Sequence, residues 1–585
     1  MSTEAATQSA LNETGLSHPR WKTEAIHFTV LTVAVLICWI PRLRGPIDLR
    51  WDGAVYYVLG TSLAEGHGYR LLNEPGNIEA NQYPPMLPAI IAAHQLILGT
   101  NDPIIVGRWL RITYFLFFNL YVFTIYLVAV GYLPSKYALL ATVICVFGLF
   151  TYFMSDLSFP EIPFALATTL FVLFNRNSGK RTDAVFAGLF AVVAYALRTA
   201  GIALLAAWVG ESVIKKDLRR AMFRSVVSGI AVFSWLLYIS AVESGQSYKN
   251  PSYEYQRADY LWYNVSYARN IFKLIQPFAP ERGSATLGDI TSRYVQNLRT
   301  IPGVLGESIS STRNLWAIGW HTLTSFSPFR SNAPWVVDLT LITLGFLILG
   351  GVGIQLARQQ WLIPLYILLS IATMCFTPFP EQFSRYMAPL TPFLVICLFT
   401  LLLSLQDVWR DALPGRRSAV ARIFTTLVVG TVLVVQASTF LLTFSRWHQK
   451  ATYTGRDGET VSYRLFFNHD AQRAFDAGID WLRTRAKAND VVASSMPHWL
   501  YLRSGLKSVM PPYESDPAKA QRLLDSVPVN YLIVDDGLAT DTRRYTVPVT
   551  QKFPNYWKRI YSDFVITEAG EKLQDRFGIY ERVHQ

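Results

Sequence analysis

At residues 47–69 the chain reads IDLRWDGAVYYVLGTSLAEGHGY, directly after its first hydrophobic run. The segment predicts a short helix that begins at Asp52 and ends at the turn Gly66-His67-Gly68. Tyr56 follows one turn after Asp52, so the two side chains share a face. A carboxylate this close to a hydrocarbon span is unusual, which makes Asp52 the candidate catalytic centre.

At residues 81–99 the sequence NQYPPMLPAIIAAHQLILG predicts a second short helix. The Tyr83-Pro84-Pro85 step starts it, because proline is tolerated best in the first turn of a helix. The apolar run that follows, 86–98, is too short to cross a bilayer. We therefore expect both helices to lie along a membrane surface.

Composition and charge place the chain among α-helical polytopic membrane proteins with soluble extensions. Of its 585 residues, 51% are hydrophobic and 14% aromatic, and long apolar runs recur as far as residue 444. Many of the basic residues behind the net charge of +12 lie in short connections between these runs, which argues against nucleic acid as a partner. The four cysteines lie in apolar segments and predict no disulfide framework.

Eleven transmembrane helices are predicted, in a domain that covers residues 26–445. The spans lie near 26–42, 108–130, 137–154, 160–175, 183–198, 200–214, 225–242, 334–356, 361–379, 386–405 and 423–444. Basic residues at the ends of the hairpins put those ends in the cytoplasm, since positive charge favours that side. Residues 1–25 then form a disordered cytoplasmic tail.

Between two cytoplasmic ends the chain must cross the membrane an even number of times. With this rule, five charged segments fall on the opposite, outer face. They are the first external loop 43–107 with Asp52, the hairpin apex 155–161, the turn at Arg198, the long external loop 243–333 and the apex at Arg385. The spans carry almost no charge at mid-bilayer, where a coupled transporter would need it. Arg42, Arg44 and Arg50 lie outside against the rule, which indicates either a basic cluster beside an external site or an error in the topology.

Four motifs resemble, in order and spacing, the GT-C superfamily of membrane glycosyltransferases. They are Asp52-x-x-x-Tyr56-Tyr57 with the following GHGY, YPPMLP from Tyr83, SDLSFPEIPF from Ser155 and FSRYMAPLTPF from Phe383. The resemblance covers roughly residues 26–405. The nearest branch is the bacterial proteins related to protein O-mannosyltransferases and the lipid A aminoarabinose transferase.

The resemblance implies an enzyme that takes a sugar from a polyprenyl phosphate at the outer face of the membrane. The first-loop aspartate of the family matches Asp52, and its second acidic position matches Asp156 or Glu161, of which the Pro-Glu-x-Pro-Phe context favours Glu161. Gly53 stands where the family often has Glu, and Tyr83-Pro84 stands where the lipid A branch has a lysine. The substrate of that branch is therefore not assumed.

Chemistry gives an independent reason for these residue types. Moving a sugar from a lipid phosphate to a hydroxyl needs a general base at the acceptor and cations at the departing phosphate. Asp52 is the candidate base, with inversion at the anomeric carbon, and Arg385 and Arg198 are the candidate phosphate ligands. The remaining predicted substrate-binding residues are Tyr56, Tyr57, Tyr83 and His321.

The same residues also have structural interpretations. In these, Asp52 caps its helix, Glu161 is a first-turn acid, Arg385 snorkels to lipid head groups and Arg198 pairs within its turn. His67 and His321 are conceivable metal ligands, but no further ligand stands at diagnostic spacing. We therefore predict no cofactor and leave a divalent metal open.

The two soluble parts of the chain have different patterns. Loop 243–333 has seven Tyr or Trp residues between 248 and 267, which form either a substrate-lining lid or an interfacial aromatic belt. After residue 445 a helix over 470–487 and strands such as 530–536 predict an external (periplasmic) α/β domain at 446–585. Asp535 and Asp536 end a strand, where ligand sites of such domains often lie. The domain has no glycine fingerprint, so we interpret it as structural or acceptor-binding and not as a second catalytic unit.

The sequence thus predicts an inverting glycosyltransferase of the bacterial inner membrane, with a polyprenyl-phosphate sugar as donor. The acceptor class is left open as a lipid, a glycan or a protein. One alternative is a polysaccharide ligase or polymerase, which would rely on Arg and His pairs without an essential first-loop Asp. The other is a non-enzymatic transporter or flippase with a polar path through the bilayer.

Overall fold

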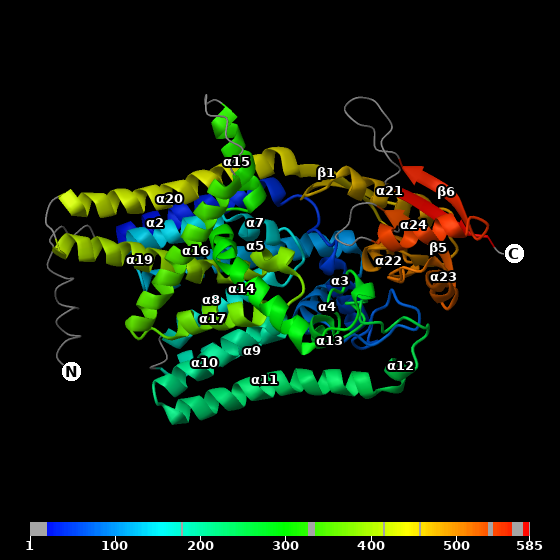
Figure 1. Ribbon diagram of the computed structural model, residues 1–585, viewed down its shortest axis with the longest axis horizontal. Coiled ribbons are helices and arrows are strands. Elements are labelled where there is room, and N and C mark those ends of the chain that lie inside the picture. Colours follow the sequence, from blue (N-terminus) through cyan, green and yellow to red (C-terminus); the bar gives the residue numbers. More distant parts are fainter. Residues whose placement is uncertain are drawn as a thin grey trace.

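The computed structural model describes residues 20–176, 180–325, 334–412, 416–455, 458–535, 542–563 and 577–583. Long helices lie side by side over most of the molecule, and the C-terminal strands form one end of it (Figure 1). Between these two parts lie the short helices α3 (Asp52–Ala64), α4 (Met86–Leu98) and α13 (Tyr267–Phe272). Most of the predicted tail 1–25 falls outside the described residues.

The predicted spans are helical. The helices of this part are α2 (Arg20–Trp39), α5 (Pro103–Val130), α6 (Ser135–Val146), α7 (Leu149–Met154), α8 (Glu161–Arg176), α9 (Arg181–Leu197), α10 (Ile202–Ile214), α11 (Leu218–Ser244), α14 (Leu287–Ile309), α15 (Arg313–Ser325), α16 (Pro334–Ala357), α17 (Leu362–Met374), α19 (Thr391–Ala412) and α20 (Arg416–Leu442). Among the described residues, six helical segments are long and apolar enough to cross a membrane, and several more apolar helices are shorter.

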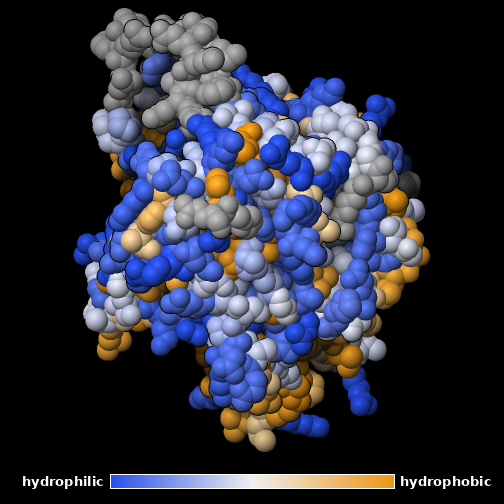
Figure 2. Space-filling view, turned by 90° about the vertical axis from the view of Figure 1, so that its right-hand side faces the viewer, coloured by the Kyte–Doolittle hydropathy of each residue, from blue (hydrophilic) through white to orange (hydrophobic). Residues whose placement is uncertain are grey.

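Several of these helices expose apolar side chains along their length. On α11 and α20 the exposed apolar residues include Met222, Val226, Phe233, Leu237, Ile423, Leu427, Val434 and Leu441. Water would make such surfaces costly, whereas lipid tails do not. By contrast, the end that carries the C-terminal strands is mostly hydrophilic (Figure 2). The chain is therefore membrane-embedded, with a polar part beyond the helices.

The predicted span 137–154 is broken in the structure. Helix α6 ends at Val146, and α7 begins at Leu149 with an extended Gly148 at its N-cap. Glycine is a poor residue for the interior of a helix, which explains why the break falls there.

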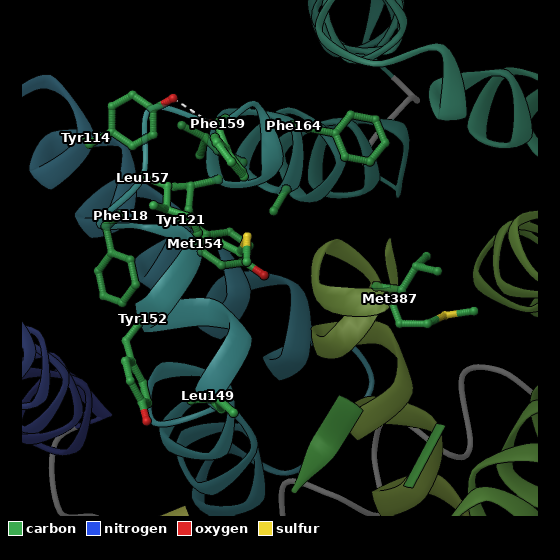
Figure 3. Close-up of a cluster of buried hydrophobic side chains, with 14 of the residues drawn as sticks. Tyr114, Phe118, Tyr121, Leu149, Tyr152, Met154, Leu157, Phe159, Phe164 and Met387 are labelled. Carbon is green, nitrogen blue, oxygen red and sulfur yellow. Dashed lines mark hydrogen bonds between the residues drawn. The ribbon is translucent and has the colours of Figure 1, made fainter. Parts of the chain in front are cut away.

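The packing around α7 is aromatic, and the Tyr114 hydroxyl donates to the carbonyl oxygen of Phe159 at 2.5 Å (Figure 3). This bond fixes the α7–α8 junction.

The loop 243–333 holds more structure than the sequence predicted. Besides α12 (Gln246–Lys249) and α13, it contains the amphipathic helix α14, which starts with a capping box of Thr286 and Asp289. Helix α14 packs so closely on α16 that a Cβ at Gly345 would lie 1.9 Å from the carbonyl oxygen of Pro302. Part of the predicted loop therefore belongs to the helix bundle.

The C-terminal part has the predicted mix of helices and strands. A hairpin of β1 (His448–Thr454) and β2 (Thr460–Phe466) precedes a five-stranded sheet in the order β4-β3-β5-β7-β6. Its strands are β3 (Val491–Ala493), β4 (Lys507–Val509), β5 (Val529–Asp535), β6 (Trp557–Asp563) and β7 (Phe577–Arg582). Its helices are α21 (Asp470–Arg483), α22 (Pro497–Ser504), α23 (Pro517–Asp525) and α24 (Arg543–Lys552). Asp536 lies outside the described residues.

Candidate active site

A cavity of about 890 Å³ lies where the helix bundle meets the C-terminal domain. Its walls come from α3, the α7–α8 junction, the turn after α9, the loop before α13, the short helix α18 (Phe383–Met387) and the segment Ser495–Trp499. All five segments that were predicted to share one face of the membrane contribute to it. The sixth contribution comes from the C-terminal domain.

A cluster of two carboxylates and two guanidiniums lies at this cavity. Arg385 bridges the two acids: its Nη2 lies 2.8 Å from Asp52 Oδ2, and its Nε lies 2.6 Å from Glu161 Oε1. Arg198 Nη1 lies 2.8 Å from the same Glu161 oxygen. The side chains of Asp52 and Arg385 keep 16% and 19% of their surface exposed, whereas Glu161 is enclosed. Glu161 therefore gathers the two cations, and Asp52 faces the cavity.

Two tyrosine hydroxyls complete the surroundings of Asp52. Tyr83 and Tyr263 both donate to Asp52 Oδ1, at 3.2 and 3.1 Å. Burial, together with the nearby Asp52 charge, raises the pKa of both hydroxyls well above its usual value, so they stay protonated and donate. The Asp52 carboxylate thus accepts hydrogen bonds from three side chains, those of Arg385, Tyr83 and Tyr263. The N-cap position of α3 is occupied by Trp51 and not by Asp52. The capping interpretation of Asp52 is wrong.

The backbone before Asp52 is held in an unusual conformation. Trp51 has φ 54° and ψ −130°. Residues other than glycine rarely adopt this backbone conformation, which costs about 1–3 kcal/mol of conformational energy. Neighbouring contacts hold this strained conformation in place. Asp48 forms backbone hydrogen bonds with Asp156 and Ser158, and the Arg50 guanidinium lies 4.7 Å from the centre of the Trp51 ring. This turn aims Asp52 into the cavity.

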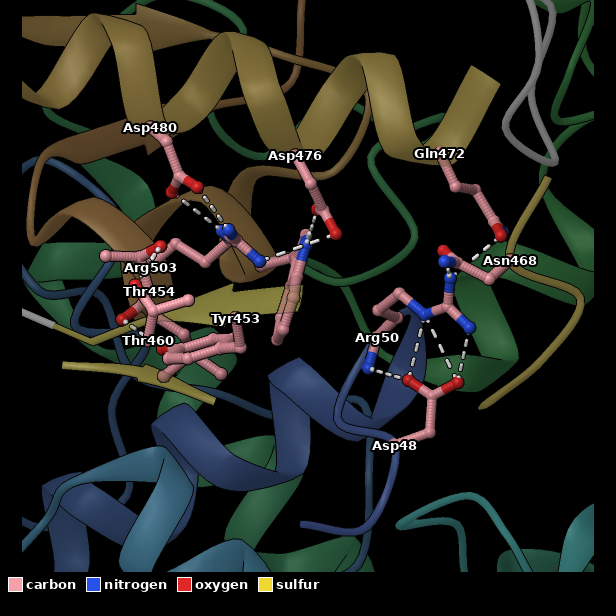
Figure 4. A network of polar contacts seen from close by, with 12 residues as sticks. Asp48, Arg50, Tyr453, Thr454, Thr460, Asn468, Gln472, Asp476, Asp480 and Arg503 are labelled. Carbon is pink, nitrogen blue, oxygen red and sulfur yellow. Dashed lines mark hydrogen bonds and ion pairs between the residues drawn. The ribbon is translucent and has the colours of Figure 1, made fainter. Parts of the chain in front are cut away.

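The C-terminal domain braces the same turn. Arg50, paired with Asp48 at 2.6 Å, donates through Nη1 to Gln472 Oε1 at 2.8 Å (Figure 4). Gln472 shares one face of α21 with Asp476 and Asp480, which bind Arg503 of α22. One helix of the C-terminal domain therefore holds the first loop and α22 in a fixed relation. Arg42 and Arg50, which lie on the outer side against the charge rule in the predicted topology, are both buried, Arg42 beside Asp156 and Arg50 paired with Asp48.

Asp156 forms a second, separate cluster. Its Oδ1 lies 2.5 Å from Arg111 Nη1 and 3.8 Å from Arg42 Nη1, and the exposed fraction of all three side chains is 0–1%. Burial alone raises the pKa of this carboxyl, but the two arginine charges outweigh it and hold the pKa below its usual range. None of these three residues lines the cavity. The structure does not bring Asp156 to the site.

Two further predicted residues also lie away from the cavity lining. Tyr57 is buried on the other side of α3, where its hydroxyl donates to the carbonyl oxygen of Asn101 at 2.8 Å. His321 is exposed on α15, which packs against α16 and α20. Tyr56 and Tyr83 do line the cavity, with their rings 4.7 Å apart.

One wall of the cavity is apolar and reaches the lipid-facing surface. Ile202 at the start of α10 and Leu236 on α11 line it while 42% and 48% of their surface stays exposed. Trp235 and Ile239 extend this wall along α11. The cavity can therefore receive an apolar chain from between the helices and present its polar end to Arg198 and Arg385.

Comparison with solved structures places the fold. The apo oligosaccharyltransferase of Archaeoglobus fulgidus is similar to 96% of this chain over 75% of its own length, with 15% sequence identity and a TM-score of 0.52. AglB from the same organism, in complex with an inhibitory peptide and a dolichol-phosphate, matches with a TM-score of 0.50 at 13% identity, over 96% of this chain and 75% of its own length. The chain has a GT-C fold. This confirms the fold class that the motifs indicated.

A shorter GT-C protein is also similar. ArnT from Cupriavidus metallidurans, bound to undecaprenyl phosphate, shares 12% of its residues with the chain, at a TM-score of 0.47, over 97% of this chain and 99% of its own. No family model and no curated protein sequence matches the chain.

The residues at the centre of the site do not fit a divalent cation between the two acids. Arg385 already occupies the space between Asp52 and Glu161 and is bonded to both. In the described part of the chain, no group of three or more His, Cys, Asp or Glu side chains is gathered as metal ligands would be. The positive charge of this site comes from its guanidiniums.

Sequence reasoning missed two side chains of the cavity. Tyr263 belonged to the aromatic run 248–267, but nothing in that run singled it out as the partner of Asp52. His498 follows β3 at the start of α22 and lines the cavity with Ser495. The expectation that strand ends of the α/β domain carry a ligand site was the one signal for this segment.

Proposed function

We propose that the protein is an inverting glycosyltransferase that moves a sugar from a polyprenyl-phosphate-linked donor to an acceptor hydroxyl. The observation that carries the proposal is Asp52, a partly exposed carboxylate beside Arg385 in a cavity that opens to the lipid-facing helices. The GT-C fold agrees with it, since AglB in that fold was solved with a dolichol-phosphate and a peptide.

In this proposal Asp52 is the general base. Its Oδ atoms take the proton of the acceptor hydroxyl while the hydroxyl oxygen attacks the anomeric carbon from the face opposite the phosphate. The bond between that carbon and the phosphate oxygen breaks, and polyprenyl phosphate leaves with the electron pair. A positioned base contributes about 10²–10⁴-fold to such a reaction.

Arg385 and Arg198 are the proposed phosphate ligands, and Glu161 positions them. Without substrate the cluster of two acids and two arginines is neutral. A donor phosphate that bonds to Arg385 competes with Asp52 for the guanidinium, which leaves the Asp52 carboxylate available to the acceptor hydroxyl. The guanidiniums then stabilise the second negative charge that develops on the leaving phosphate.

The remaining residues of the site take supporting roles in the proposal. Tyr83 and Tyr263 orient the Asp52 carboxylate, and Tyr56 packs on Tyr83. Asp156 supports the α7–α8 junction from the enclosed cluster with Arg111. The orientation is proposed with the N-terminus in the cytoplasm and the domain 446–585 outside a bacterial inner membrane, on the strength of the charged connections.

The test is sugar transfer by purified protein in lipid nanodiscs. Undecaprenyl-phosphate hexoses serve as donors, hydroxyl compounds of the glycoside, peptide and lipid classes serve as acceptors, and the variant is Asp52→Asn. The matched control is Asp102→Asn, a first-loop aspartate that caps α5, where asparagine is an equally good cap.

We expect wild type and Asp102→Asn to transfer sugar, and Asp52→Asn to lose transfer while it still binds undecaprenyl phosphate. Full activity of Asp52→Asn would remove Asp52 as the base. Failure of the wild type to bind or turn over any donor would overturn the function itself and favour the ligase or transporter alternatives.

A further inference from the structure

The C-terminal domain contributes one wall of the cavity, and a histidine stands in it. Segment Ser495–Trp499 connects β3 to the first turn of α22, and each of its residues lines the cavity. Pro497 starts α22, and its carbonyl oxygen accepts from Ser508 of β4 at 2.5 Å. The segment is thus tied to the sheet behind it, so its position is set by the C-terminal domain.

His498 lies directly beside the surroundings of Asp52. Its ring packs edge-on against the Tyr263 ring, with centroids 4.9 Å apart and planes at 78°. Tyr263 in turn donates to Asp52. Only 3% of the His498 surface is exposed, and its Nε2 has no hydrogen-bond partner among the residues that the structure describes. A buried ring nitrogen without a partner is costly unless a ligand completes it.

The imidazole of His498 is neutral over the working range of pH. Burial lowers its pKa to about 3, and the opposing charge of Asp52 is too weak to reverse this. A neutral ring nitrogen exchanges hydrogen bonds with a hydroxyl but offers no charge to a phosphate. The cation end of the cavity, with Arg198 and Arg385, and the histidine end therefore suit different chemical groups.

The side chains around His498 are aromatic. Trp499 follows it in the lining, and Trp262 lies next to Tyr263 with ring centroids 5.8 Å apart. Ring faces carry partial negative charge and pack well against the polarised C–H faces of a sugar. Neutral hydrogen bonding and aromatic faces together favour a glycan over a charged ligand at this end.

We propose that the wall Ser495–Trp499 is the acceptor subsite, that it takes a sugar acceptor, and that His498 Nε2 hydrogen-bonds a hydroxyl of that sugar. The inference rests on the proposed function, because the lipid phosphate must occupy the arginine end for the acceptor to lie at the other. Asp52 stands between the two ends, where a base must stand. His498 is a positioning residue and takes no proton in the reaction.

The spacing between the base and this subsite is fixed by α21. Its Gln472 holds Arg50, two residues before Asp52, and its Asp476 accepts from the Trp499 indole at 2.8 Å. Asp480 pairs with Arg503 at the end of α22. The residues on both sides of the reacting groups are therefore anchored to one helix, as accurate positioning of an acceptor requires.

The experiment measures initial rates with undecaprenyl-phosphate hexoses as donors and para-nitrophenyl glycosides as acceptors, each at varied concentration. The variants are His498→Leu, which removes the ring nitrogens, and His498→Gln, whose amide reaches the place of Nε2. The matched controls are His448→Leu and His448→Gln. His448 is 4% exposed, and within the described part of the chain its Nε2 also lacks a hydrogen-bond partner. Burial lowers its pKa to about 4, but His448 lies outside the cavity lining.

We expect His498→Leu to raise the KM for the glycoside by about 5–50-fold, the range for loss of one buried hydrogen bond. Its KM for the donor and its affinity for undecaprenyl phosphate stay within about twofold of the wild type, because the lost hydrogen bond is made to the acceptor and not to the phosphate. His498→Gln restores most of the acceptor affinity, and the His448 variants change neither KM.

Other results contradict the inference in distinguishable ways. An unchanged acceptor KM in His498→Leu, or a loss of donor affinity instead, overturns the role of His498. A wild type that binds undecaprenyl phosphate but uses only a serine or threonine peptide, or no glycoside, overturns the sugar acceptor. A wild type that neither binds the lipid phosphate nor turns over any donor overturns the proposed function first.

Discussion

Two arginine–carboxylate clusters lie at the same end of the helix bundle, and their acidic members, Asp156 and Glu161, are five residues apart in the sequence. In one, Asp156 with Arg111 and Arg42 is enclosed on every side. In the other, Glu161 holds Arg385 and Arg198 beside a cavity, and Asp52 keeps part of its surface open. The two clusters contain the same residue types, but only the second can be reached from the cavity.

This difference separates structural from chemical roles. A buried ion pair without an opening can only hold elements together, and the Asp156 cluster joins the first loop, α5 and the α7–α8 junction. A cluster at a cavity can exchange a partner for a ligand. The sequence left open the choice between Asp156 and Glu161. Both side chains are 1% exposed, so the two acids differ in their partners: Glu161 binds Arg385 and Arg198, which line the cavity, whereas Asp156 binds Arg111 and Arg42, which do not.

The largest expected difference between the two clusters is the effect of a substitution on kcat. Asp52→Asn removes the charge of the open cluster and is expected to lower kcat by about 10²–10⁴-fold, because a general base is lost. Its thermal unfolding temperature should change little, since the pair is partly exposed. A comparable loss of kcat in a folded Asp156→Asn protein would break the comparison.

Stability should respond in the opposite way. Asp156→Asn leaves two buried guanidiniums without a counter-charge and is expected to lower the free energy of unfolding by about 3–5 kcal/mol. Thermal unfolding in detergent measures this loss. The double variant Asp156→Asn/Arg111→Gln should recover part of it, and absence of any recovery would show that the pair does not couple.

Affinity for the lipid phosphate tests the open cluster alone. Arg385→Gln is expected to weaken binding of undecaprenyl phosphate by about 10–100-fold, the usual range for a hydrogen bond to a charged group. Native mass spectrometry of the nanodisc complex measures it. The control Arg313→Gln removes an exposed arginine paired with Asp338, and it should leave the affinity unchanged.

The smallest effects concern two hydroxyls, one that bonds Asp52 and one that bonds the backbone of the α7–α8 junction. Tyr263→Phe removes one of the donors to Asp52 and is expected to lower kcat by about 3–10-fold. Tyr114→Phe removes the bond to Phe159 and should instead cost about 1 kcal/mol of stability with kcat within about twofold of wild type. Equal effects of the two changes on kcat would erase the distinction between a hydroxyl that orients Asp52 and one that only holds the junction.

The sequence predicted the helices well because hydrophobic length is a strong signal. The break between α6 and α7 was missed, since Gly148 sits in an apolar run that reads as continuous. Helix α14 was missed because it is amphipathic and too polar to resemble a span, although Thr286 and Asp289 carry a capping signal.

The site was predicted in part. Asp52, Glu161, Arg198 and Arg385 came from separate segments, and the parity of the spans was enough to bring those segments to one face. The parity of the spans does not tell which side chains point into a cavity. The predicted site therefore included Tyr57, Asp156 and His321, which lie outside the lining, and omitted Tyr263 and His498, which belong to it. His498 approaches across a domain interface, and no local pattern records such a contact.

The bond from Arg50 to Gln472 spans 422 residues of chain. At a synthesis rate of about 5–20 residues per second, α21 leaves the ribosome roughly 20–80 seconds after the loop that it must brace. Until then, the strained turn at Trp51 has no support from that side. A chain whose synthesis stops before α21 would therefore lack the support that holds the Asp52 turn, so the geometry of the cavity is complete only when synthesis is nearly finished.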